Sequence, residues 1–184
     1  MTVVGRQIIH HPSSIILALD PSSTVIGYGV LAAGGQFVEG GLILPDARSD
    51  GSFERIIAMH ADLVRLFERL RPGVLLVEWT KGKVNERRHG GLGAGLAVYG
   101  CGVGAAALAA WQWSQAHADC RTEAICENDW TRGVPKRDRQ LAVAAEYPQY
   151  GARIGEDPGG DIADGIGLAA WWIRERKVER GLFV

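Results

Sequence analysis

Four carboxylates stand where a negative charge is costly unless a cation meets it. Asp20 and Glu78 each end a short continuous apolar run, and Asp161 and Asp164 lie three residues apart at the start of a long apolar stretch. Carboxylates beside buried strands are partly desolvated, and several of them together repel one another. Oxygen ligands without His or Cys are typical of hard ions such as Mg²⁺ or Mn²⁺. The pattern predicts one metal site made by all four.

A site of this kind can hydrolyse a phosphodiester. Two Mg²⁺ ions held ~4 Å apart activate a water molecule and stabilise the leaving oxygen of an in-line attack. We therefore expect two ions per site, with Mn²⁺ able to substitute, and metal-dependent cleavage of a nucleic acid strand. Each carboxylate alone also has a structural explanation: Asp20 as a turn residue, Glu78 as a strand-end charge and Asp161 as a helix N-cap.

The elements that must position these residues follow from the apolar pattern. Residues 15–19 and 74–77 read as buried strands joined by a helical crossover, so they are expected to be parallel neighbours with Asp20 and Glu78 at one edge of the sheet. Asp161 and Asp164 share one face of a helix, in its first turn. The predicted strands are residues 15–19, 26–31, 36–44, 74–77 and 122–126, and the predicted helices are residues 53–70, a Gly/Ala helix within 92–115, residues 135–147 and a final helix from 161.

Basic residues gather in two segments near the carboxylates. The loop at residues 79–89 directly follows Glu78, and residues 134–140 form the start of a basic helix. Both segments could equally be solvated surface, but their position favours contacts with DNA phosphates. The predicted DNA-binding residues are Trp79, Lys81, Lys83, Asn85, Arg87, Arg88, Arg132, Arg137 and Arg139.

Length and composition limit the class of protein. With 184 residues, 47% apolar content and a net charge of −1, the chain is expected to form one globular domain over residues 14–184 after an extension at residues 1–13. The charge gives no overall sign of nucleic acid binding. Three irregularly spaced cysteines favour a reducing cytosol. Residues 92–115 carry no formal charge, but their Gly and Ala content favours a closely packed helix, against this subunit or a partner, over a membrane span.

Three motifs resemble a known family. Residues 17–30 (LALDPSSTVIGYGV), Val77-Glu78 and residues 161–169 (DIADGIGLA) resemble, in order and spacing, the acidic motifs of RuvC-type Holliday junction resolvases. The likeness covers about residues 14–175. It implies an α/β fold of RNase H type, with a five-stranded mixed sheet flanked by helices on both faces. It also implies a cytoplasmic homodimer that makes paired symmetric nicks in four-way DNA junctions during recombination and repair.

The resemblance assigns roles by position. Asp20, Glu78, Asp161 and Asp164 would be the catalytic metal ligands, and Lys136 would stabilise negative charge beside the scissile phosphate. Lys81 stands where many members place an aromatic wedge, so the residue that opens the junction is an open question, with Trp79 nearby. The extension and the additional tryptophans are further departures, compatible with a divergent, phage-encoded member.

Other functions remain as alternatives. The hairpin after Asp20 also resembles the phosphate-binding hairpin of actin-like kinases and ATPases, but the chain has no second glycine-rich phosphate loop, so no nucleotide cofactor is expected. A non-catalytic junction-binding protein would not need four acids. A nuclease of broader branched-DNA specificity would need them all.

Overall fold

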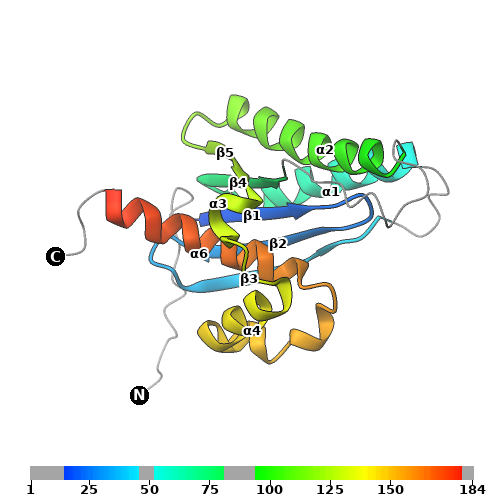
Figure 1. The fold of residues 1–184 in the computed structure, drawn as a ribbon. Helices are drawn as coiled ribbons and strands as arrows, with labels where there is room; N and C mark the ends of the chain where they lie inside the picture. Colours follow the sequence, from blue (N-terminus) through cyan, green and yellow to red (C-terminus); the bar gives the residue numbers. More distant parts are fainter. Residues whose placement is uncertain (1–14, 46–51, 81–93, 180–184) are drawn as a thin grey trace, which may run out of the picture.

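The computed structural model describes residues 15–45, 52–80 and 94–179, which fold around one sheet (Figure 1). The five strands lie in the order β3-β2-β1-β4-β5. β1 pairs antiparallel with β2, and β2 with β3, whereas β1, β4 and β5 run parallel. The strands are β1 (Ile15–Pro21), β2 (Ile26–Ala32), β3 (Phe37–Ile43), β4 (Val74–Trp79) and β5 (Arg121–Cys126). The prediction of a five-stranded mixed sheet is confirmed.

The register of the central strands brings two of the predicted site residues together. β1 is the middle strand, and its first five residues are all buried. In the parallel pair, Leu19 lies opposite Val77, so Asp20 and Glu78 follow side by side in neighbouring strands. A continuous apolar run suits a strand that is covered on both faces. The two carboxylates therefore share one edge of the sheet.

Helices cover both faces of the sheet. α1 (Ser52–Leu70) and α2 (Ala94–Ala116) pack on one face, and α6 (Asp161–Glu179) with α4 (Lys136–Glu146) on the other (Figure 1). Alternate residues of β1 point to opposite cores, since side chains alternate along a strand. Leu17 and Leu19 join the core under α1 and α2, whereas Ile16 and Ala18 join the core under α6. The expected two-sided architecture is confirmed.

Three short helices were not predicted from the sequence. They are α3 (Glu127–Thr131), α5 (Pro148–Gly151) and the 3₁₀ helix η2 (Ile154–Glu156). Helices this short bury little surface and show no clear apolar period, which explains why the pattern missed them. The Gly/Ala helix forms as α2, and within the described residues no helix is long and apolar enough to cross a membrane.

Candidate active site

Asp20 is held at the end of β1 by a tight turn. The Ser22 hydroxyl accepts a hydrogen bond from the backbone N–H of Val25 (3.1 Å) and donates one to the Val25 carbonyl (2.8 Å). The backbone of α2 lies directly against this turn, since a Cβ on Gly102 would come within 2.2 Å of the Ser22 carbonyl oxygen. These contacts fix the direction in which β1 delivers its carboxylate.

Glu78 is the more deeply buried of the two strand carboxylates. It is 7% exposed, and its Oε2 accepts a hydrogen bond of 2.9 Å from the indole Nε1–H of Trp130 in α3. Trp130 lies 52 residues further along the chain, so no local signal could have paired the two. Besides packing against its neighbours, Trp130 therefore orients a predicted metal ligand.

Asp157 caps α6, which leaves the carboxylate of Asp161 available for other contacts. The Asp157 side chain is fully buried, and its two oxygens accept hydrogen bonds from the backbone N–H groups of Ile162 (3.2 Å) and Ala163 (3.0 Å). The Tyr150 hydroxyl donates a third bond to it, of 2.8 Å. Such bonds satisfy the free N–H groups of a helix start. The capping role considered for Asp161 is therefore performed by Asp157, which the sequence pattern did not indicate.

Glycines allow α6 to lie directly on β2. A Cβ on Gly27 would come within 2.3 Å of the Asp161 carbonyl carbon, and one on Gly29 within 2.2 Å of the Ile166 nitrogen. On the helix side, a Cβ on Gly165 would come within 2.5 Å of the Gly29 nitrogen. Because only hydrogen atoms stand between the two backbones, the first turn of α6 reaches the edge of the sheet where Asp20 lies.

Lys136 lies among three of the carboxylates. Its Nζ is 3.2 Å from Asp20 Oδ2, 2.5 Å from Asp161 Oδ1 and 3.1 Å from Asp164 Oδ2. Lys136 begins α4, and it is the residue to which the family resemblance assigned a role beside the reacting phosphate. The structure therefore brings Asp20, Glu78, Asp161, Asp164 and Lys136 to one edge of the sheet.

The site has too little positive charge of its own. Burial, reinforced by the charges of Asp164 and Asp161, raises the pKa of Asp20 to about 6, although Lys136 acts in the opposite direction. Burial and repulsion from Asp20 and Asp164 raise the pKa of Glu78 to about 9, against the Trp130 hydrogen bond. Burial opposes the charge of Lys136, but the carboxylates outweigh it and hold its pKa above its usual range.

A divalent cation fits this donor set. The carboxylates offer hard oxygen ligands, and burial and mutual repulsion, which raise the pKa values of Asp20 and Glu78, would be relieved by further positive charge. Among the described residues, no three potential ligands already surround one point at metal-binding spacing. Instead, the Lys136 ammonium contacts three of the four carboxylates. Binding of an ion would thus require Lys136 to shift.

The predicted DNA-binding residues lie in different settings. Arg132 and Arg137 are exposed on the α3–α4 side, and Trp79 is half-buried at the end of β4. Arg139 is not on the open surface, because its guanidinium faces Asp164. The remaining predicted contacts lie outside the described residues: Lys81, Lys83, Asn85, Arg87 and Arg88.

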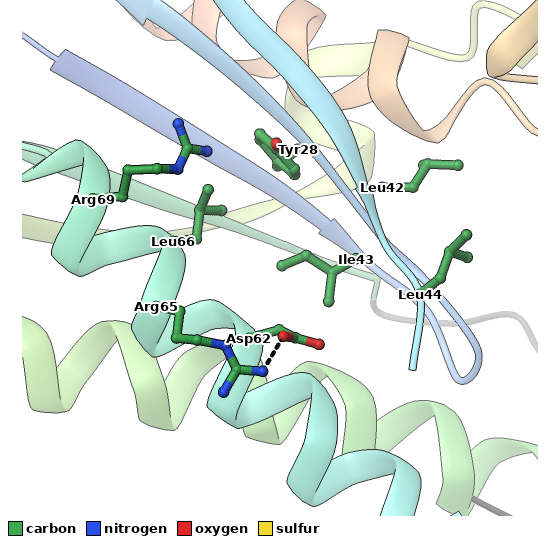
Figure 2. Close-up of a pocket in the computed structure, with 8 residues that line it drawn as sticks. All are labelled: Tyr28, Leu42, Ile43, Leu44, Asp62, Arg65, Leu66 and Arg69. Carbon is green, nitrogen blue, oxygen red and sulfur yellow. Dashed lines mark hydrogen bonds and ion pairs between the residues drawn. The ribbon is translucent and has the colours of Figure 1, made fainter. Parts of the chain in front are cut away.

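A separate groove of about 380 Å³ lies on the α1 side of the sheet (Figure 2). Tyr28 and Leu42 from the sheet and Leu66 and Arg69 from α1 are among its lining residues. Figure 2 also shows the Arg65–Asp62 ion pair on its rim. None of the predicted site residues lines this groove.

Two solved structures share the fold of this chain. The chain matches the RuvC of Thermus thermophilus in complex with a Holliday junction substrate, with a TM-score of 0.65 and 20% identity over 89% of this chain and 96% of that one. A second structure of Thermus thermophilus RuvC gives a TM-score of 0.60 and 19% identity over 91% and 96%. No family model matches the sequence, and no curated protein matches it either. The chain therefore has a RuvC-like fold of RNase H type.

Proposed function

We propose that this protein is a divalent-metal-dependent endonuclease that resolves four-way DNA junctions by paired symmetric nicks. The observation that carries the proposal is the gathering of Asp20, Glu78, Asp161 and Asp164 with Lys136 at one sheet edge. The RuvC-like fold supports the substrate class, since the similar Thermus protein is seen with a Holliday junction.

The roles of the residues follow from their chemistry. The four carboxylates would hold the metal, with Mg²⁺ as the expected ion and Mn²⁺ as a substitute. A metal bound there supplies Lewis acidity and lowers the pKa of a coordinated water. Lys136 is 40% exposed and has a flexible stem, so its ammonium can turn from the carboxylates to a phosphate oxygen once other positive charge neutralises them. There it would stabilise the charge that develops during cleavage.

The exposed arginines of this face extend the site toward DNA. Arg132 and Arg137 flank Lys136 in sequence, and both are exposed. We propose that they contact phosphates on either side of the cut, together with basic residues of the 79–89 segment, which follows Glu78 in the sequence. Such contacts would position the junction without reading its sequence.

A second copy of the chain is the proposed partner. α2 exposes Cys101, Gly104, Leu108 and Trp111 at alternating spacings of three and four residues, which places them on one face. Leu108 is 48% exposed and Trp111 56%, on a helix without a charged residue. An apolar helix face of this kind is typical of a subunit contact. Two copies related by a two-fold axis would present two equivalent sites to a junction of similar symmetry.

The test is cleavage of labelled four-way junctions and matched linear duplexes, with Mg²⁺ or with chelator. We expect Mg²⁺-dependent paired nicks in the junction, and their loss in Asp20→Asn and Asp161→Asn. Asp119→Asn is the matched control, because Asp119 is an exposed turn residue just before β5, at the opposite end of the parallel strands from the candidate site. Cutting in chelator, or full activity of Asp20→Asn, would remove the metal-site assignment. Equal cutting of duplex and junction would indicate a nuclease of broader specificity.

A further inference from the structure

The candidate site contains a second cation, Arg139, whose setting differs from that of Lys136. Its Nε donates to Asp164 Oδ1 and its Nη2 to Asp164 Oδ2, both at 2.8 Å. This two-bonded arrangement matches the fork of a guanidinium to both oxygens of a carboxylate. Asp164 therefore has a positive group on each of its oxygens before any metal binds.

Arg139 is held in this position by contacts with Asp164, Val134 and Trp130. Its side chain is 11% exposed, and its Nη1 donates to the Val134 carbonyl oxygen at 2.7 Å. The guanidinium also lies over the ring of Trp130, 5.2 Å from the centroid. Arginine does not lose its proton in proteins. Unlike the more exposed Lys136, Arg139 can neither swing away nor become neutral when a metal arrives.

The same arginine connects the two most buried of the four candidate metal ligands, Asp164 and Glu78. Asp164 contacts Arg139, Arg139 stacks on Trp130, and the Trp130 indole holds Glu78. Asp164 and Glu78 come from α6 and β4, which lie on different layers of the fold. Arg139 thus sets the position of Asp164 directly and supports the Trp130–Glu78 contact through the stack.

The balance between the carboxylates and the cationic side chains of the site is unfavourable for two bound ions. Four ionised carboxylates match the charge of two divalent cations, but the fixed charge of Arg139 already offsets a quarter of it, even after Lys136 has shifted to admit an ion. In a partly desolvated site, an excess of positive charge is strongly unfavourable. Beside Arg139, one divalent ion leaves the carboxylates with a single net negative charge, whereas two ions would give a net positive charge and would repel a guanidinium that cannot leave.

From these contacts we propose that the site binds one divalent ion tightly rather than two, and that Arg139 takes the place of the second ion's charge beside Asp164. This inference rests on the proposed metal-dependent function and concerns the number of ions that serve it. It departs from the sequence-based expectation of two ions, which considered the carboxylates without their cationic neighbours.

The test is a Mn²⁺ titration of the full-length protein without DNA, followed by the electron paramagnetic resonance signal of free Mn²⁺. We expect one ion per wild-type chain, with any second ion bound at least 100-fold more weakly. Arg139→Gln should bind two, because the fixed charge is gone. Arg139→Lys, which keeps the charge, should still bind one. Arg174→Gln is the matched control, since it removes an arginine that is 55% exposed and pairs with Glu146 instead.

Each outcome decides a different point. Two ions of similar affinity in the wild type, or a single ion in folded Arg139→Gln, would overturn the role of Arg139. Circular dichroism checks folding, and if Arg139→Gln does not fold, the wild-type and Arg139→Lys stoichiometries decide. A wild-type protein that binds no Mn²⁺ would remove the metal assignment itself. One bound ion without junction cleavage would leave the inference standing and refute the proposed nuclease.

Discussion

The close contact between α6 and β2 leads to a direct test of how the site is assembled. In Gly29→Ala, the new methyl group would lie 2.2 Å from the Ile166 nitrogen and 2.5 Å from the Gly165 carbonyl carbon. The shorter contact falls about 1.2 Å below the 3.4 Å at which ordinary contact begins. Both neighbours are backbone atoms of a buried helix, so no side chain can turn aside. The helix itself has to move by about an ångström.

Two measurable effects follow from this shift. Overpacking of this kind costs about 3 kcal/mol of unfolding free energy, at the upper end of its usual range. For a chain of this length, that loss lowers the melting temperature by roughly 10 °C. A displacement of about 1 Å at the carboxylates of α6 reduces junction cleavage by about 100-fold. The folded fraction at assay temperature must remain high for the second effect to be attributed to geometry.

The assays are urea unfolding followed by circular dichroism and cleavage of a labelled junction in Mg²⁺. Gly155→Ala is the matched control, because Gly155 is exposed and its Cβ would meet no atom within 4 Å. It should change the unfolding free energy by less than about 0.5 kcal/mol. If Gly29→Ala were as stable and as active as this control, the helix would not be held by backbone contact, and the argument for how Asp161 and Asp164 reach Asp20 would fail.

Four further outcomes are expected. Asp157→Ala should lower the free energy of unfolding in urea by about 2–3 kcal/mol, because it removes the cap of α6 and leaves buried donors without acceptors. A decrease of less than about 0.5 kcal/mol would contradict the capping role of Asp157. Because the pKa of Glu78 is about 9 in the folded protein and 4.5 is its ordinary value, the metal-free protein should lose stability as pH rises between these values. In Glu78→Gln, the unfolding free energy measured in urea with chelator should vary less between pH 5, 7 and 9 than in the wild type. The same variation with pH in both proteins would refute the raised pKa of Glu78. Lys136→Met should cut junctions at least about 100-fold more slowly while binding Mn²⁺ more tightly, and weaker Mn²⁺ binding would contradict its position as a competitor for the carboxylates. Trp111→Glu should give a monomer by light scattering where the wild type gives a dimer, because a charge on the exposed face of α2 opposes its burial; an unchanged dimer would place the contact elsewhere.

The sequence alone predicted the sheet and the side-by-side placement of two carboxylates. The runs before Asp20 and Glu78 are apolar without alternation, and only a strand covered on both faces uses such a run. A helical crossover between them favours parallel neighbours, and parallel neighbours end at the same edge. The three-residue spacing of Asp161 and Asp164 likewise follows from helix geometry. These features depend on the order of apolar and acidic residues within short segments, which can be read directly from the sequence.

Only the tertiary structure decided which groups surround those carboxylates. The bond from Trp130 to Glu78 spans 52 residues, and the fork from Arg139 to Asp164 spans 25. Arg139 stands in a basic segment that reads equally well as a DNA-binding surface, and Asp157 stands in a turn rich in Pro and Gly. Their partners depend on which helix faces meet after α6 settles on the glycines of β2. The sequence therefore determined where the negative charge lies, and packing determined how much of it the protein's own cations offset.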